Sequence, residues 1–247
     1  MSNRNEARNI TAPRRPARAR STTQEAVRGI KRYIRDQNLR PGDVLPPETF
    51  LCEELGCSRS AIREAIRTLV TLDIVEVRHG YGTFISEMSL EPLINVVTFR
   101  TVLDADTSLE NLRHVVEMRK VLDLSVGQEL VETFSEDARG ELLELVDKMD
   151  ANHKQGVPFA QESRNFHLAL LARIRNPLIT ELGEAFRRIQ SESRALLDLP
   201  TPDDINRAIE AHRDIVEALS ARDLDAYRVA VCNLHAPFLR MPEDNLG

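Results

Sequence analysis

The sequence predicts a mainly α-helical protein with two parts: a small N-terminal domain that ends in a β-hairpin, and an all-helical bundle. Two observations carry this prediction. Apolar residues recur at three- and four-residue spacing along most of the chain, and one short stretch between residues 75 and 85 alternates instead. Only 10 of the 247 residues are glycine and 4% are aromatic, which also favours helix.

The charge of the chain is divided unevenly between its two ends. The whole chain has a formal charge of −6, but residues 1–86 contain 15 Lys and Arg against 10 Asp and Glu, a net of +5. Residues 87–247 contain 18 against 29, a net of −11. This contrast predicts two domains with different partners.

Residues 1–21 are predicted to form a disordered basic arm. The first 20 residues contain six arginines, one glutamate and two prolines, with no apolar period. The arm is either a solvated tail or a contact to nucleic-acid phosphates or the minor groove. It accounts for the whole charge of +5, so residues 21–86 are neutral overall.

Two helices are predicted after the arm. Val27, Ile30 and Ile34 share one face of the first, which ends at the segment 39–43 with its Pro-Gly pair. The second begins at Pro46-Pro47-Glu48, because proline suits the first helical turn, and ends at Gly56.

A third helix and a hairpin complete the first domain. Ser58 is a good N-cap for a helix whose buried side carries Ile62 and Ile66. Residues 75–78 then alternate like a strand, residues 79–82 form a turn, and residues 83–85 return. This order of elements predicts a winged helix-turn-helix over residues 22–86.

Every segment after Ser86 is predicted to be helical. Residues 87–107 form a linker and the first bundle helix, and the remaining helices pack as one antiparallel bundle over residues 108–240. The seven expected helices are 89–104, 108–132, 136–153, 158–174, 177–198, 203–220 and 223–239.

The third helix has the composition of a DNA-reading helix. Its N-terminal residues reach base edges in the major groove in helix-turn-helix proteins, and arginine can bind guanine there with two hydrogen bonds. Arg59, Ser60 and Arg63 are expected to point outward, and the small Ser60 and Ala61 allow a close approach. The alternative is an ordinary helical hairpin whose arginines are only solvated.

The first domain resembles the GntR family of bacterial transcription regulators. The resemblance rests on the segments 39–48, 55–65 and 80–84. It implies a homodimer on a short palindromic operator, with DNA contacts at Arg59, Ser60, Ala61, Arg63, His79 and Gly80. One departure is Thr49, where some relatives have a DNA-contacting arginine.

The bundle resembles the FadR-type (FCD) subfamily, in the segments 117–123, 165–167, 210–216 and 223–226. This resemblance implies that residues 108–240 bind an effector and dimerise. Many such domains hold a divalent metal such as zinc through an Asp-x-x-x-His pair and two later histidines.

The candidate metal ligands are His167, His212 and His235. His167 and His212 lie on the apolar faces of their predicted helices, and His235 lies at the edge of its face. Ser163 replaces the family's aspartate, and His235 comes one residue after the expected position, Leu234. The alternative is three core histidines that are satisfied by hydrogen bonds.

Arg119 is the candidate effector-binding residue. It falls on an apolar helical face, and a buried arginine requires an anion. The anion is either an internal carboxylate, Asp123 or Glu117, or a bound acidic metabolite.

We therefore expect a ligand-responsive transcription repressor whose effector is a small acidic metabolite or an acyl-CoA. The alternative is a metal-dependent helical hydrolase with a DNA-binding appendage, but the chain has no His-Asp tandem or nucleophile motif, so we expect no enzyme. Without a membrane span or signal peptide we expect a cytoplasmic protein with no membrane partner. Three cysteines, an odd set without metal-ligand spacing, predict no disulfide framework.

Overall fold

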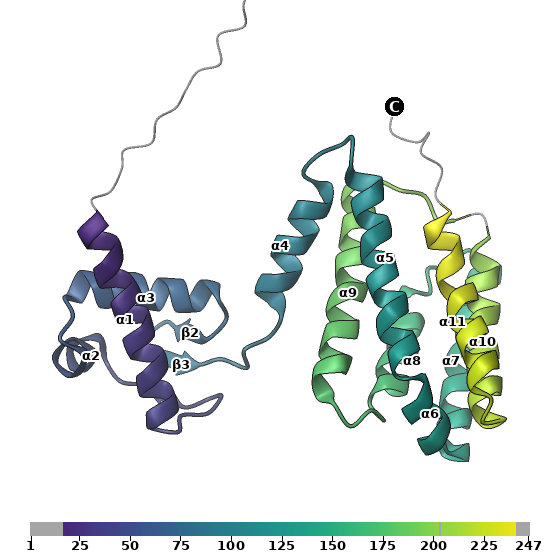
Figure 1. The fold of residues 1–247 in the computed structure, drawn as a ribbon, viewed down its shortest axis with the longest axis horizontal. Helices are drawn as coiled ribbons and strands as arrows, with labels where there is room; N and C mark the ends of the chain where they lie inside the picture. Colours follow the sequence, from purple (N-terminus) through teal and green to yellow (C-terminus); the bar gives the residue numbers. More distant parts are fainter. Residues whose placement is uncertain (1–16, 203, 241–247) are drawn as a thin grey trace, which may run out of the picture. The chain divides into compact units, whose positions relative to one another are not determined.

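The computed structural model describes residues 17–202 and 204–240. The chain divides into two compact units, with the boundary between Ser89 and Leu90 (Figure 1). Each unit has its own core, and each is described by itself. In the described part of the chain, none of the helices has the length and apolar character needed to cross a membrane.

The first unit contains three helices and three short strands. In chain order these are α1 (Ala17–Asp36), β1 (Val44–Leu45), α2 (Glu48–Leu55), α3 (Arg59–Thr71), β2 (Val75–Arg78) and β3 (Gly82–Ile85). Because α1 begins at Ala17, the prediction that the arm extends to residue 21 is wrong for residues 17–21. These residues are rich in alanine and arginine, which are strong helix formers. The rest of the predicted arm lies outside the described residues.

The strands form one antiparallel sheet in the order β1-β3-β2. The hairpin pairs Val75 with Ile85 and Arg78 with Gly82. On the other side of β3, Val44 pairs with Phe84, although a two-residue strand has no detectable period in the sequence. The sheet thus places the turn at residues 79–81 at the far end of the hairpin.

The core of the first unit holds α1 and α2 against α3. Ile30, Leu51 and Ile62 come from the three helices and are fully buried, as are Val75 and Ile85 from the hairpin. The chain turns between α2 and α3 at Gly56, which has the left-handed φ of 63° that favours glycine. This packing fixes the orientation of α3 on the unit.

The second unit is an all-helical bundle. Its helices are α4 (Glu91–Val102), α5 (Ser108–Ser125), α6 (Gly127–Thr133), α7 (Glu136–Lys154), α8 (Ala160–Leu171), α9 (Pro177–Leu196), α10 (Ile205–Ser220) and α11 (Leu224–Leu239). The expected helix 108–132 is divided at Val126 into α5 and α6. A Cβ atom on Gly127 would lie 2.7 Å from ring atoms of Tyr227, so the break brings bare backbone against that ring.

The main core of the bundle lies among α5 to α8, α10 and α11. Tyr227 is fully buried in it, and its hydroxyl donates to the backbone carbonyl of Asp123 at 2.7 Å. A smaller apolar cluster joins α4, α5 and α9 through Ile94, Val115 and Ile189. Helix α9 therefore packs on α4 as well as on the bundle.

Candidate functional site

Helix α3 presents polar side chains at its N-terminal end. The Ser58 hydroxyl accepts a hydrogen bond from the backbone nitrogen of Ala61 at 3.2 Å, which caps the helix. It also lies 3.1 Å from the hydroxyl of Ser60. Arg59, Ser60 and Arg63 are exposed, so all three side chains are available to a ligand outside the unit.

Ala61 faces the inside of the unit. Its side chain is only 5% exposed and belongs to the core of the first unit together with Ile62. The DNA contact that the resemblance implies at Ala61 stays a prediction, and its methyl group is not on the outward surface. Position 61 falls on the same helical side as Ala65, which is also buried.

Arg63 has a partner within its own unit. Its Nη2 atom lies 3.2 Å from Oε2 of Glu48, at the start of α2, and both side chains are exposed. Such a surface ion pair contributes about 0–1 kcal/mol. A phosphate or a guanine edge can therefore replace Glu48 at little cost.

The wing ends in an exposed aromatic residue. His79, Gly80 and Tyr81 form the tip, and Tyr81 is 82% exposed. Gly80 has a φ of 81°, a conformation that favours glycine. Behind the tip, the guanidinium of Arg78 lies 4.3 Å from the centre of the Phe84 ring. Sequence reasoning missed Tyr81, although its place between two glycines was a usable signal.

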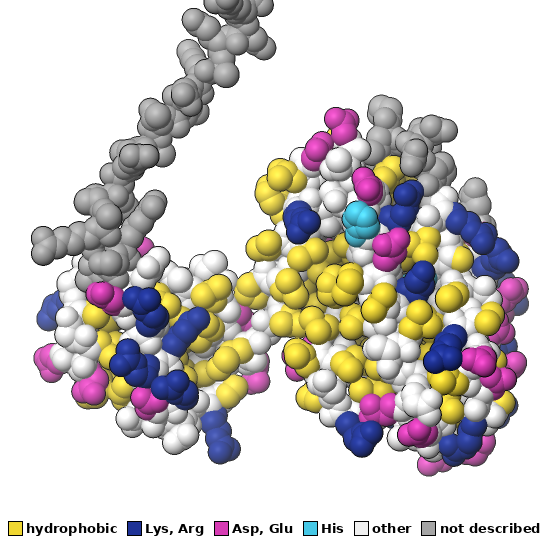
Figure 2. All heavy atoms as spheres, viewed as in Figure 1, with side chains coloured by type: hydrophobic (Ala, Val, Ile, Leu, Met, Phe, Trp, Pro, Cys, Tyr) yellow, Lys and Arg dark blue, Asp and Glu magenta, His cyan; other side chains and the backbone are white. Residues whose placement is uncertain are grey.

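A second basic surface lies on α1. Figure 2 shows Lys and Arg side chains gathered over this helix. The exposed basic residues of α1 include Arg28, Lys31, Arg32 and Arg35. Arg35 also pairs with Asp36 at 2.9 Å. In the sequence this helix is recognisable only as a core helix, because its apolar period dominates the pattern.

The bundle encloses a cavity of about 480 Å³. The three predicted histidines from α8, α10 and α11 all line it: His167, His212 and His235. Their side chains are buried, at 7%, 2% and 1% exposure. The exposed residues at its mouth include Gly156, Val157 and Pro158, in the loop between α7 and α8.

His167 and His212 form one half of the histidine cluster. Their ring centres are 5.3 Å apart. Nδ1 of His212 lies 2.5 Å from the carbonyl oxygen of Ala208, and its Nε2 lies 3.5 Å from the hydroxyl of Ser163. Burial lowers the pKa of His212 to about 4 and the pKa of His167 well below its ordinary value. Both rings are therefore neutral at pH 7.

His235 pairs with a carboxylate from a distant helix. Its Nε2 lies 2.8 Å from Oδ2 of Asp123 on α5, whereas its buried Nδ1 has no hydrogen-bond partner among the described residues. Burial lowers the pKa of His235. Burial raises the pKa of Asp123, but the hydrogen bond from His235 and the charges of His235, His167 and Arg119 outweigh it, so this pKa is lowered. Sequence reasoning considered Asp123 only as a partner of Arg119.

Arg119 lines the same cavity but forms neither predicted internal ion pair. Asp123 is engaged with His235, Glu117 is exposed, and no described carboxylate lies within 4.0 Å of the Arg119 guanidinium. Arg119 instead donates from Nη1 to Oε1 of Gln190 on α9. Burial lowers the pKa of Arg119. A cation thus lies in the bundle with an amide as its hydrogen-bond partner.

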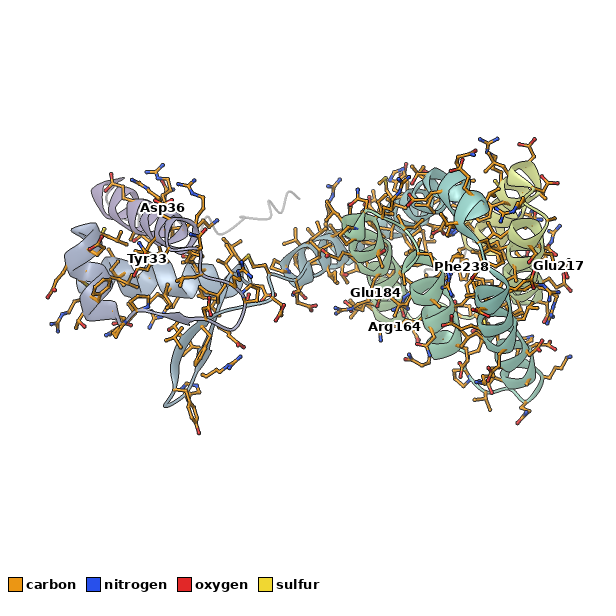
Figure 3. All side chains as sticks on the ribbon, turned by 90° about the horizontal axis from the view of Figure 1, so that it is seen from below. Tyr33, Asp36, Arg164, Glu184, Glu217 and Phe238 are labelled. Carbon is orange, nitrogen blue, oxygen red and sulfur yellow. The ribbon has the colours of Figure 1, made fainter. Side chains whose placement is uncertain are left out.

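Two further arginines of α9 line the cavity, Arg187 and Arg194. Arg187 pairs with Glu184 at 2.8 Å, and Glu184 also binds Arg164 of α8 at 2.7 Å. Figure 3 shows Arg164 and Glu184 next to each other on their two helices. Among the described residues the lining of the 480 Å³ cavity includes no Asp or Glu. Asp123 and Glu184 instead line a smaller pocket of about 10 Å³ that shares Arg119 and His167.

Two protein families match the two units. Residues 22–85 match the family described as bacterial regulatory proteins, gntR family, and residues 114–235 match the FCD domain. The first match covers the helices and the wing of the first unit. The second covers the helices that form the 480 Å³ cavity.

Known relatives agree over most of the chain. It is 24% identical over 203 residues to the galactonate operon transcriptional repressor of Escherichia coli, which covers 81% of this chain and 87% of the relative. It is 26% identical over 193 residues to the HTH-type transcriptional regulator LutR of Bacillus subtilis, which covers 76% and 86%. The structure of a Streptococcus agalactiae GntR protein matches with a TM-score of 0.64 and 27% identity, over 89% of this chain and 99% of that one.

These matches decide between the two functional classes that the sequence left open. Both the families and the relatives are regulators of transcription, so they do not support the hydrolase alternative. The chain therefore belongs to the GntR family, as a ligand-responsive DNA-binding regulator with an FCD effector domain, and it is not an enzyme.

Proposed function

We propose that this regulator is a repressor that binds a short palindromic operator as a homodimer and releases it when a small acidic metabolite or an acyl-CoA occupies the bundle. The names of two relatives, the galactonate operon repressor and a probable D-xylose operon repressor, support repression. Because it acts on DNA in bacteria, we place it in the cytoplasm.

One observation carries the effector proposal: the described lining of the 480 Å³ cavity contains Arg119, Arg187 and Arg194 and no carboxylate. Cavities of this size are typical of small-molecule sites. A buried cation is costly unless an anion accompanies it. An acidic ligand that enters the cavity would supply that anion to Arg119.

Helix α9 offers a physical route from the effector to the linker. Its residues Gln190 and Arg194 line the cavity, while the neighbouring Arg188 binds Glu91 at the start of α4 with distances of 2.6 and 3.2 Å. Helix α4 is the first helix after the boundary at Ser89. If α9 can adopt two placements, a ligand that binds one of them more tightly favours that placement. Helix α4, which is bound to α9, would then move with it.

An apolar surface on the bundle supports the homodimer. Figure 2 shows hydrophobic side chains gathered over α4, α5 and α9. The exposed apolar residues of this part of the chain include Val96 and Phe99 on α4 and Leu103 directly after it, which are 63–66% exposed, and Val121 on α5, at 55%. Patches of this kind usually mark an interface, and a second copy presents the same self-complementary surface.

We also propose that the histidine cluster holds a divalent transition metal such as zinc. The residues fit in kind, because neutral imidazole is the metal-binding form and the pKa values of His167, His212 and His235 are all lowered. The buried Nδ1 of His235 also lacks a partner among the described residues. The described side chains do not, however, bring three ligands to one point. A bound metal would supply positive charge next to the effector's carboxylate.

Metal analysis of the purified protein tests this second proposal. We expect about one zinc or similar ion per chain, lost in His235→Ala. Protein that contains no metal after gentle purification, and takes up none when zinc is added, would contradict it.

The regulator proposal is tested by selecting operator sequences from random duplex DNA with the full chain. We expect an inverted repeat bound by two chains, and release of the DNA by one member of a carboxylate panel. Selection of a single half-site bound by one chain would contradict the dimer, and DNA affinity unaffected by every acid or acyl-CoA in the panel would contradict the effector.

A further inference from the structure

We infer that the effector is a monocarboxylate with a hydrocarbon body, and neither a polyhydroxylated acid nor a CoA ester. This inference rests on the proposed effector function of the 480 Å³ cavity. It follows from the positions of charge, hydrogen-bonding groups and apolar surface in the lining.

One part of the cavity lining is polar and buried. His167, His212, His235 and Gln190 are all buried and lie on four different helices, α8, α10, α11 and α9. Arg119 donates to Gln190 there. The anionic head of a ligand would therefore be bound at this part of the lining, away from the exposed mouth at Val157 and Pro158.

The charges of the lining call for one carboxylate. Arg187 is paired with Glu184. Arg194 donates to the carbonyl of Pro200 and lies 5.5 Å from the centre of the Phe238 ring. Arg119 has no described carboxylate within 4.0 Å, so a single carboxylate on the ligand would give its guanidinium a direct anionic partner.

A large part of the lining is apolar. The apolar lining residues are Val157, Pro158, Phe159, Ala160, Ile205, Ala208, Leu234 and Phe238. Burying hydrocarbon against such a wall raises affinity by about fourfold for each methylene group. Hydroxyl groups in the same place would lose their water without new partners.

Neutral hydrogen-bonding side chains other than histidine are few in the lining. Besides the charged and histidine residues, the lining contains only Ser163, Gln190, Ser191 and Thr201 among the described residues. Gln190 is bound to Arg119, and Ser163 contacts His212. Ser191 and Thr201 are exposed, so they remain in contact with water. The hydroxyl groups of a sugar acid would therefore have to compete with these existing contacts or with water.

The test is calorimetric titration of the full chain, as purified, with acids that share a carboxylate and differ in body. Hexanoate and gluconate both have six carbons, acetate has the head alone, and 1-hexanol has the body alone. We expect hexanoate to bind at least thirtyfold more tightly than gluconate and acetate, with a negative heat-capacity change. We expect 1-hexanol to bind at least tenfold more weakly than hexanoate.

Two variants assign the two ends of the ligand. Arg119→Gln should weaken hexanoate at least tenfold and leave 1-hexanol unchanged. Val157→Thr, which keeps the shape of a half-exposed side chain, should weaken hexanoate severalfold and leave acetate unchanged. Circular dichroism and the melting temperature of each variant show whether it folds like the parent chain.

Three outcomes would overturn the inference, and operator binding measured in parallel separates them from failure of the proposed function. If gluconate binds more tightly than hexanoate and releases the operator, the effector function stands and the hydrocarbon body is wrong. If hexanoyl-CoA binds more tightly than hexanoate, the free carboxylate is wrong. If no acid or CoA ester binds while the operator is still bound, the effector function fails and this inference fails with it.

Discussion

The Nε2 atom of His235 lies 2.8 Å from the Oδ2 atom of Asp123, and this contact ties the last helix of the bundle, α11, to α5. It is reinforced by Tyr227 of α11, whose hydroxyl donates to the backbone carbonyl of the same Asp123. The pair also fixes the proton of His235 on Nε2, so that its other nitrogen keeps a free lone pair in the cavity wall.

Asp123→Asn should destabilise the bundle by about 1–3 kcal/mol, because it replaces a charged acceptor of a buried hydrogen bond by a neutral amide. Urea unfolding measures the change. The control is Asp225→Asn. Asp225 lies on α11, its side chain is 89% exposed, and it pairs with Arg228. We expect a change below about 0.5 kcal/mol for the control, and equal changes in the two variants would show that the His235–Asp123 contact is unimportant.

Acid should destabilise the metal-free protein through His212. Burial lowers its pKa from 6.5 to about 4, so between these values the unfolded chain binds a proton that the folded chain excludes. The free energy of unfolding is therefore highest above pH 6.5 and falls as the pH drops toward 4, by roughly 3 kcal/mol for this group. Unfolding in urea with a chelator, at steps between pH 7 and 4, measures the slope. The slope should decrease in His212→Gln, and an unchanged slope would rule out His212 as its source.

Gly127→Ala should cost about 1–3 kcal/mol, because the new Cβ would lie 2.7 Å from two ring atoms of Tyr227, a ring held in place by its hydroxyl. Gly140→Ala is the matched control, since no heavy atom lies within 4 Å of its Cβ position on α7. Alanine there should stabilise the helix by about 0.5–1 kcal/mol. Thermal unfolding gives both values, and a neutral effect at residue 127 would mean that Tyr227 can move.

Arg59→Ala should weaken binding to a selected operator by about five- to hundredfold and relax the base preference at one position, as expected for a direct base contact. Arg67→Ala is the control, because Arg67 is exposed on α3 but two turns further along and paired with Glu64. Fluorescence anisotropy with operator and mutated operators measures both effects. A uniform loss across all sequences would instead assign Arg59 to a phosphate.

Arg188→Ala should uncouple the cavity from the DNA-binding unit. We expect the effector to retain its affinity within about threefold, because Arg188 is not among the cavity-lining residues. The ratio of the operator affinities without and with effector should fall toward 1. Arg228→Ala removes an exposed ion pair on α11 and is the control. Operator affinity with and without effector provides the ratio, and a full response in Arg188→Ala would exclude the Glu91 contact from the coupling route.

The features that could be predicted from the sequence are those determined by nearby residues. The cap at Ser58, the left-handed Gly56 and the hairpin ending at Ile85 each depend on residues less than a dozen positions apart. The break at Val126 was not predicted, and the ring against which Gly127 packs there belongs to Tyr227, a hundred residues later. The sequence could not choose the partner of Asp123 either, because His235 and His167 approach it from two other helices and Arg119 lies one turn before it on α5.

The burial of Ala61 shows a narrower limit. Residue size and the helical period together left its direction open, and only the packing of α1 on α3 decides it. Arg119 shows the reverse case. Its inward direction followed from the apolar period, but the identity of its partner, Gln190, depends on a helix 71 positions away.

Helix α9 both lines the cavity and packs on α4, and this constrains how ligand specificity can diverge among related regulators. A substitution at Gln190 or Arg194 that accommodates a new metabolite would also disturb the helix that packs on α4, and so alter DNA affinity in the absence of ligand. Val157, in the loop before α8, and Phe238, near the end of α11, also line the cavity. Helix α11 packs mainly on α10, α5 and α6 and not on α4. We expect specificity to diversify first at these two places, where a new ligand can be acquired without resetting the basal level of transcription.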